Sequence, residues 1–269
     1  MLIIVGLLLS IGASIGTYYG FGLFDKSLWY LFLLIPFVIT FFIIYLNLYW
    51  GIVLIGIAKY RKIVYPKKVS KYHLFNVKLV SQFVLALNGV KAKKIGNKKW
   101  PQEPGLFLFN HVSDYDPWVL YTMMKGRYAF VGKKALRDII MVRCIASSIG
   151  TLYVDNGDKE LNYEMVDRAV EYITEKETSV VIAPEGTRNF TGDLLPFKHG
   201  GFNIAKRAKC PIYFIGISGM ENAVNKRKGH IAKVKVELFG TIKPEEYEGK
   251  TAGEIAVMCE NKYRSYFKQ

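Results

Sequence analysis

The chain has 269 residues, of which 51% are hydrophobic, and a formal net charge of +15 at neutral pH. Its apolar residues are distributed too unevenly for a single uniform soluble domain. The three cysteines, Cys144, Cys210 and Cys259, are odd in number and widely separated. This spacing argues against disulfide bonds and a zinc site and suits a reducing cytoplasm.

Two apolar runs open the chain. Residues 1–24 and 28–58 carry no charged side chain, and each is long enough to cross a hydrocarbon core about 30 Å thick. The link between them is so short that it predicts an antiparallel hairpin. A cleaved signal peptide is disfavoured, because no Lys or Arg precedes the first run and no clear cleavage site follows it. Pro36 and Asn47 leave open a kinked or partly interfacial second helix.

Basic residues follow the second run at once: Lys59, Arg61, Lys62, Lys67, Lys68 and Lys71. The positive-inside rule places everything downstream of such a run in the cytoplasm. Four aromatic residues are expected to anchor the hairpin at the membrane interface: Trp29, Tyr30, Tyr49 and Trp50. We therefore expect a membrane hairpin of two helices in residues 1–58 and a cytoplasmic domain in residues 59–269.

The whole net positive charge belongs to the second part, because residues 1–58 contain only Asp25 and Lys26 as charged residues. A basic domain held at a bilayer is attracted to anionic headgroups by about 1 kcal/mol for each Lys or Arg near the surface. Nucleic acid is the competing partner for so basic a domain. The sequence has no recognition motif for it, so anionic membrane lipids are the expected partner.

The second part alternates between short apolar runs and amphipathic ones. Residues 73–88 have helical spacing and end at Gly89, and a basic piece at 90–96 reads as a strand. Further strands are predicted at 105–109, 151–154, 179–183, 211–217 and 234–240, with helices at 117–124, 159–175, 200–208 and 251–267. The pattern predicts an α/β fold whose largely parallel sheet is covered by helices on both faces. Loops at the carboxyl ends of its strands are the expected site.

A histidine and two aspartates follow the strand at 105–109, in the stretch FNHVSDYDPW. On a continuous helix, positions five apart point about 140° away from each other, so His111 and Asp116 can meet only if the histidine lies in the turn before the helix. A purely structural interpretation is available. Ser113 and Asp116 can form a capping box, or Asp116 can cap the helix ahead of Pro117.

The capping interpretation leaves His111 unexplained. A metal site of His111, Asp114 and Asp116 lacks a second histidine or a cysteine-rich set of ligands. No nucleophile motif or cysteine elbow is present. A His–Asp pair without a protein nucleophile remains, in which Asp116 holds the imidazole and His111 takes a proton from a substrate hydroxyl. This arrangement describes direct acyl transfer.

A second polar stretch follows the strand at 179–183. Glu185, Gly186, Thr187 and Arg188 stand at its end, followed by Lys198 and two glycines that open a helix. Arg and Lys beside a helix N-terminus make a phosphate site, because guanidinium geometry is bidentate and the first backbone N–H groups are free. The alternative is a polar turn with a solvated arginine.

These stretches resemble the glycerolipid acyltransferases, a family that includes 1-acylglycerol-3-phosphate acyltransferase. The family's N-H-x-S-x-x-D block is matched by Asn110, His111, Ser113 and Asp116, and its E-G-T-R block by residues 185–188. A lysine-bearing region is matched by VGKKAL (131–136) and GTLYVDN (150–156), and a late block by FKHG (197–200) and PIYFIGI (211–217). The resemblance covers about residues 75–240.

The resemblance implies roles for individual residues. His111 would be the general base and Asp116 its partner, while Arg188 with Lys133 or Lys134 would bind a phosphate. The other expected substrate-binding residues are Glu185, Gly186, Thr187 and Lys198, with Pro211 in the pocket wall. One departure concerns the acceptor headgroup: the family's usual arginine after the middle aspartate is Asn156 here. Arg143, Lys159 and the second lysine of the GKK pair are candidates to compensate.

The implied activity is acyl transfer from a thioester, either acyl-CoA or acyl carrier protein, to the free hydroxyl of 1-acyl-glycerol-3-phosphate. The thioester is a co-substrate, and neither a cofactor nor a metal is expected. Asn156 lends weight to another lysophospholipid or a lyso-aminolipid as acceptor. The alternative from a different class is a non-catalytic lipid-binding membrane protein.

Overall fold

A computed structural model describes residues 2–22, 34–58, 60, 65, 69–175, 177–189, 194–220 and 231–267. Its contacts divide the chain into two compact units, Met1–Lys59 and Tyr60–Gln269. Two groups of residues from the predicted hairpin lie outside the described residues. These are the aromatic residues Trp29 and Tyr30 and, except Lys71, the basic residues that follow the second run.

The first unit contains helices α1 (Leu2–Gly20) and α2 (Leu34–Ala58). The two helices pack closely at Gly6, where an added Cβ would come within 2.5 Å of the Tyr45 ring. Pro36 lies in the first turn of α2, where a missing N–H is tolerated. Among the described residues, no helix combines the length and apolar character that crossing a membrane requires.

The second unit is built on a seven-stranded sheet with the order β1-β7-β6-β2-β5-β3-β4. The strands are β1 (Val90–Ile95), β2 (Leu106–Phe109), β3 (Tyr128–Lys133), β4 (Leu152–Val154), β5 (Ser179–Ile182), β6 (Ile212–Ser218) and β7 (Ala232–Ile242). Neighbouring strands are parallel except β6 and β7, which are antiparallel. The prediction of a largely parallel α/β sheet is therefore confirmed.

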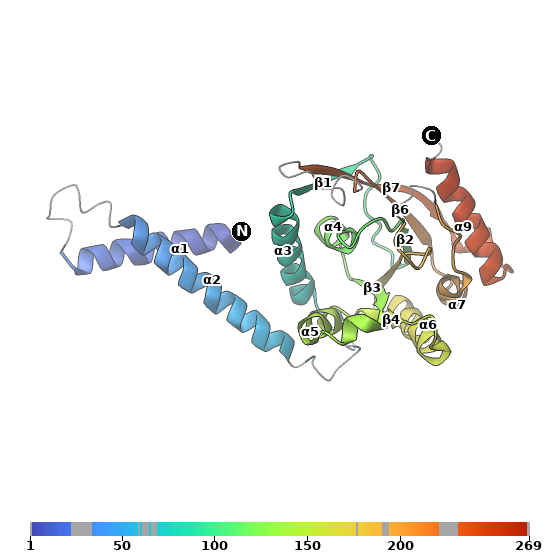
Figure 1. Ribbon diagram of the computed structural model, residues 1–269, viewed down its shortest axis with the longest axis horizontal. Helices are drawn as coiled ribbons and strands as arrows, with labels where there is room; N and C mark the ends of the chain where they lie inside the picture. The colour runs from blue at the N-terminus through green and yellow to red at the C-terminus, as the bar shows by residue number, and fades with distance from the viewer. Residues whose placement is uncertain are drawn as a thin grey trace. The chain divides into compact units, whose positions relative to one another are not determined.

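Helices cover both faces of this sheet (Figure 1). The α-helices of the second unit are α3 (Lys71–Leu87), α4 (Asp116–Met123), α5 (Ile140–Ser148), α6 (Lys159–Thr174), α7 (Asn203–Ala208) and α9 (Ala252–Phe267). Short 3-10 helices are η4 (Lys134–Arg137), η5 (His199–Phe202) and η6 (Pro244–Tyr247). Figure 1 shows α3 and α4 on one side of the strands and α6, α7 and α9 on the other.

The sequence predicted most of the strands and α-helices but missed two. Strand β3 lies between β5 and β4 in the sheet, although its residues had been assigned only as part of a motif. Helix α5 was also missed, because its nine residues are fewer than the window in which helical periodicity can be recognised. The predicted helix at 200–208 is a 3-10 turn followed by a short α-helix.

The two central strands are tied to the last helix by one hydroxyl. The side chain of Tyr263 on α9 is fully buried, and its O–H lies 2.8 Å from the backbone carbonyl oxygens of both Leu108 and Ile215. These carbonyls belong to the adjacent parallel strands β2 and β6. All four residues of β2 are buried, so the loop that follows β2 extends from a rigid support.

Candidate active site

The site begins where β2 ends, at Asn110. The Asn110 side chain donates a hydrogen bond to the carbonyl of Ile217 and accepts one from the N–H of Ile217, each at 2.8 Å. An amide side chain thus continues the pairing of β2 with β6 for one more position. It fixes the direction in which the chain leaves the sheet toward His111.

His111 and Asp116 meet in the turn, as their spacing predicted. The His111 Nδ1 atom lies 2.9 Å from Oδ2 of Asp116, and the side chains are 20% and 0% exposed. The histidine ring also packs edge-on against Phe109, the last residue of β2. Because a carboxylate oxygen accepts, Nδ1 carries the proton, and Nε2 is the ring nitrogen available to a substrate.

The Asp116 carboxylate is anchored by the turn itself. Its Oδ2 also accepts hydrogen bonds from the backbone N–H groups of Val112 at 2.7 Å and Ser113 at 2.8 Å. The capping box is present in part, because Ser113 Oγ accepts from the N–H of Tyr115 at 3.2 Å while Asp116 accepts from the N–H of Ser113. The alternative with Asp116 as the N-cap is wrong, because α4 begins at Asp116 after Tyr115. The carboxylate points back to the turn that carries His111. Its Oδ1 is buried without a hydrogen-bond partner among the described residues.

A second loop holds the backbone of His111 from the side of β5. The N–H of His111 donates to Oε1 of Glu185 at 3.2 Å, and the carbonyl of His111 accepts from the N–H of Asn189 at 2.7 Å. Oε2 of Glu185 accepts from the Asn189 side chain and from the N–H of Leu195. Glu185 is only 3% exposed, so it acts on His111 rather than lining an open acceptor pocket.

Burial raises the pKa of Glu185 above its ordinary value, although the N–H groups of Leu195 and His111 and the Asn189 side chain oppose the shift. Asn189 was not predicted from the sequence. It directly follows the E-G-T-R block, but a single asparagine in a polar loop carries no signal of burial. We call the hydrogen bonds between His111, Glu185 and Asn189 the backbone clamp.

Arg188 lies close to the histidine turn. Its Nη1 forms an ion pair with Oδ2 of Asp114, and both side chains are exposed. The predicted approach of the guanidinium to the His–Asp loop is therefore present. The part of the chain that the structure describes contains no group of three or more His, Cys, Asp and Glu placed to hold a metal ion.

Gly186 and Lys198 are in direct contact. Gly186 has a positive φ of 66°, and an added Cβ would come within 2.7 Å of the Lys198 side chain. The Lys198 ammonium donates to Oδ1 of Asn156 at 2.8 Å. Asn156, which replaces the family's usual arginine, is thus hydrogen-bonded to a lysine. That lysine is Lys198, which was not among the residues suggested from the sequence to compensate for the arginine.

The remaining predicted residues lie in several parts of the fold. Lys133 ends β3, which is two strands from β2, and the Lys134 ammonium pairs with Asp158 at 2.9 Å. That hydrogen bond raises the pKa of Lys134. Thr187 is exposed. Pro211 precedes β6 at its amino end, where its carbonyl accepts from the N–H of Leu106, so it does not line the His111 site.

The three cysteines are free and buried. Desolvation raises the pKa of the Cys210 thiol to about 12 and also raises the pKa of Cys259. Such thiols are protonated at neutral pH and do not act as nucleophiles. None lies in the loops around His111.

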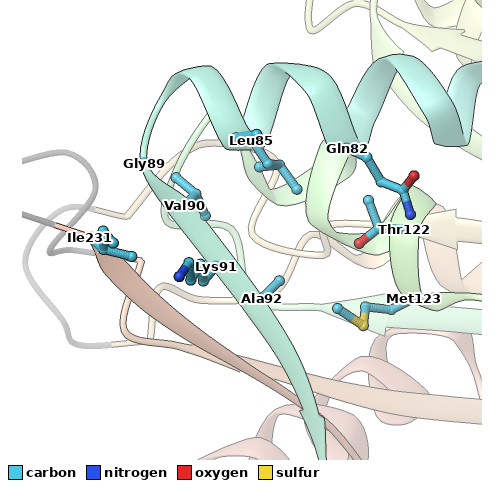
Figure 2. Close-up of a pocket in the computed structure, with 10 residues that line it drawn as sticks. Gln82, Leu85, Gly89, Val90, Lys91, Ala92, Thr122, Met123 and Ile231 are labelled. Atoms are coloured by element: carbon cyan, nitrogen blue, oxygen red, sulfur yellow. The ribbon is translucent and has the colours of Figure 1, made fainter. Parts of the chain in front are cut away.

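A cavity of about 430 Å³ lies on the α3 and α4 side of the sheet (Figure 2). Its lining residues are Gln82, Leu85, Ala86, Gly89, Val90, Lys91, Ala92, Thr122, Met123 and Ile231. Most come from the end of α3, the start of β1 and the end of α4, and Ile231 directly precedes β7. His111 and Asp116 lie beside the start of α4, so the cavity is separate from the His–Asp turn.

A buried aspartate that orients a partly exposed histidine, beside an arginine and a lysine at the carboxyl ends of parallel strands, defines a site for acid–base group transfer. Comparison with known proteins agrees with this class. Residues 91–218 match the family model described as Acyltransferase. The matched residues make up a little under half of the chain and include both the His–Asp turn and the loop after β5.

Three relatives carry the name 1-acyl-sn-glycerol-3-phosphate acyltransferase. The Saccharomyces cerevisiae protein is 24% identical over 64% of this chain and 57% of its own length. The Haemophilus influenzae protein is 29% identical over 57% and 64%, and the Escherichia coli protein 28% identical over 72% and 78%, respectively. The chain thus spans less than two thirds of the yeast and Haemophilus relatives.

A solved structure has a similar fold. It is described as the crystal structure of the 1-acyl-sn-glycerophosphate (LPA) acyltransferase, PlsC, from Thermotoga maritima. The TM-score is 0.60 at 20% sequence identity, and the match covers 74% of this chain and 79% of that one. At this identity the likeness supports the α/β fold.

The backbone clamp predicts a pH-dependent effect of Glu185→Gln. In the variant, the new NH₂ group meets the N–H donors of Leu195 or Asn189, which costs about 1–3 kcal/mol. The pKa of Glu185 is higher in the folded state than in the unfolded state. The protonated carboxyl therefore stabilises the fold fully below the pKa of the unfolded state, and this contribution is lost as the pH rises through the pKa of the folded state. In denaturant titrations, the wild type should have a larger free energy of unfolding than the variant at acidic pH. This difference should decrease as the pH rises.

The exposed Glu248→Gln is the matched control and should follow wild type throughout. If the difference in free energy of unfolding between wild type and Glu185→Gln increased with rising pH, a raised pKa at Glu185 would be contradicted.

Proposed function

We propose that this protein transfers a fatty acyl group from a thioester donor to the free hydroxyl of 1-acyl-glycerol-3-phosphate, which gives phosphatidate. The observation that carries the proposal is the 2.9 Å hydrogen bond from His111 Nδ1 to buried Asp116, which leaves Nε2 to act as a base. The names of the relatives support the reaction and its acceptor.

In this mechanism, His111 Nε2 removes the proton from the acceptor hydroxyl while its oxygen attacks the thioester carbonyl carbon. The carboxylate of Asp116 stabilises the imidazolium, helped by the absence of any donor to its Oδ1 among the described residues. When the tetrahedral intermediate collapses, the carbon–sulfur bond breaks and the thiolate takes the proton from His111. No covalent acyl-enzyme forms, and no cofactor takes part besides the co-substrate acyl-CoA or acyl carrier protein.

The acceptor phosphate would bind at the loop after β5. Arg188 forms an ion pair with Asp114 in the His–Asp turn, and Asp114 is an exposed carboxylate. Exposed ion pairs are worth only about 0–1 kcal/mol, so a dianionic phosphate can displace Asp114. Lys198, beside Gly186, would supply a second cation. Thr187 would line the same loop, and Lys133 and Lys134 remain more distant candidates.

Residues 1–58 would hold the catalytic domain, residues 59–269, at the cytoplasmic face of a membrane. Both helices expose large apolar side chains, among them Leu8 at 64% and Ile39 at 53%. A lysolipid gains about 0.8 kcal/mol for each methylene that stays in lipid. Docking the site at the headgroup plane avoids the extraction of this substrate into water.

Replacement of the base tests the reaction. His111→Ala should lower the turnover rate about 10²–10⁴-fold, the range expected for a general base. Asp116→Asn should also lower it, because the imidazole loses its carboxylate partner. Product phosphatidate is measured by mass spectrometry in a membrane assay with lysophosphatidate and acyl-CoA. His199→Ala, an exposed histidine outside the turn, is the control, and near-native transfer by His111→Ala would refute the mechanism.

Arg188→Ala tests the acceptor. The variant should raise KM about tenfold or more for lysophosphatidate but not for monoacylglycerol, which lacks the phosphate, since a charged hydrogen bond contributes about 1.5–3 kcal/mol. Arg207→Ala, which removes another exposed and ion-paired arginine, is the control. An equal rise in KM for both acceptors would show that Arg188 does not bind the phosphate and would favour another lipid acceptor.

Charged substitutions on the first unit test membrane attachment. Leu8→Glu with Ile39→Glu should release the protein from lipid vesicles in a flotation assay, because each buried charge opposes insertion. Activity toward long-chain acceptors should fall, while activity toward a short-chain soluble acceptor persists. Val257→Glu, at an exposed apolar position of α9, should leave flotation unchanged. Unaltered flotation of the double variant would show that other residues hold the protein at lipid.

A further inference from the structure

Four lysines form an exposed cluster on the edge of the sheet. Strand β1 pairs in parallel with β7, so that Lys91 lies opposite Lys233 and Lys93 lies opposite Lys235. All four residues are exposed, and we call them the lysine patch. Like charges directly opposite on neighbouring strands are destabilising. In the described part of the chain, no acidic group pairs with any of the four.

The lysine patch lies at the same end of the sheet as the His–Asp turn. Because β7 is antiparallel to β6, the start of β7 adjoins the end of β6, with Lys235 opposite Ser218. The neighbouring residue Ile217 is bonded to Asn110, which directly precedes His111. Two interstrand spacings separate β7 from β2, a distance of about 10 Å.

The lysines point to the face of the sheet that carries α9. Val90 and Ala92 border the cavity under α3. Because side chains alternate along a strand, Lys91 and Lys93 point to the other face. Lys91, at the edge of the sheet, also borders the cavity. On the α9 face, the nearest acid along β7 is Glu237, which accepts a hydrogen bond from Tyr266 at 2.7 Å. Helix α9 covers β7 at Phe239, whose ring stacks on Tyr266. The lysines before Glu237 remain uncovered.

This position favours a soluble partner over a lipid surface. Helix α3 covers the opposite face of β1 and exposes an apolar stripe of Tyr72, Phe75, Phe83 and Leu87. A bilayer that contacted this stripe would leave the lysine patch facing water. Apart from Lys91, which borders the cavity, the patch is an open strand surface, whereas sites for small ligands are concave. An acidic protein surface fits an open patch of four positive charges.

We propose that the lysine patch docks an acidic acyl carrier protein, which presents the acyl thioester to His111 at the end of a flexible arm. The inference rests on the proposed acyl transfer and assigns a surface to one of its two possible donors. The arm would cross the end of β6, where Ser218 and Gly219 offer little side-chain obstruction. Carriers of this kind separate the docking surface from the reacting atom, as the lysine patch is separated from His111.

The test compares two donors in the full-length protein. Lys233→Glu with Lys235→Glu should raise KM for a palmitoyl-loaded acidic acyl carrier protein about tenfold or more, because rim charges set the rate and salt dependence of association. KM for palmitoyl-CoA and kcat with either donor should stay within about twofold. Binding of the fluorescently labelled holo carrier, which needs no turnover, should weaken in parallel, and its salt dependence should decrease.

The matched control is Lys125→Glu with Lys206→Glu, which removes the same charge from exposed positions before β3 and β6, at the opposite end of the sheet. It should leave both donors unaffected. Lys233→Gln with Lys235→Gln should give a smaller loss of the same kind and serves where the charge reversal impairs folding, as monitored by circular dichroism.

Three outcomes would overturn the docking surface. Equal changes in KM for both donors would indicate general attraction of anions. Weaker binding to anionic vesicles with unchanged carrier binding would indicate a lipid contact. Absence of carrier binding by the wild type, alongside turnover of palmitoyl-CoA, would refute the docking surface while the proposed function stands. Failure of turnover with both donors would instead count against the proposed function.

Discussion

Three N–H groups converge on one buried oxygen, Oδ2 of Asp116, and the rest of the site depends on this convergence. A carboxylate taken out of water is costly unless hydrogen bonds compensate its charge. The N–H groups of Val112 and Ser113 and the Nδ1–H of His111 provide that compensation. Any rearrangement of the turn would break at least two of these bonds, so one interaction fixes the loop, the tautomer and the direction of Nε2.

The supports of the turn come from both neighbours of β2 in the sheet. On the β6 side, the Asn110 side chain pairs with the backbone of Ile217. On the β5 side, the backbone clamp engages the N–H and the carbonyl of His111 through Glu185 and Asn189. The parallel strands deliver all these groups to one end of the sheet, which explains why the polar residues of two separate sequence blocks meet there.

Sequence patterns predicted the parts of this structure that repeat or have fixed spacing. The parallel sheet followed from alternating apolar runs, and the meeting of His111 with Asp116 followed from helical geometry. The capping box correctly predicted the hydrogen bond from the N–H of Ser113 to Asp116, but it could not show that the same oxygen also binds His111. The role of Glu185 depends on burial, and the bond between Lys198 and Asn156 joins residues far apart in the chain. Neither property has a local signature.

The hydroxyl of Tyr263 connects helix α9 to the strands that support the active site. It lies between the carbonyls of Leu108 and Ile215, on the two strands that Asn110 joins one step later. Tyr263 therefore bridges β2, whose following loop carries the base, and the neighbouring strand β6. Damage to α9, by proteolysis or by an attached segment that strains the helix, would reach His111 through the sheet without touching any residue of its turn.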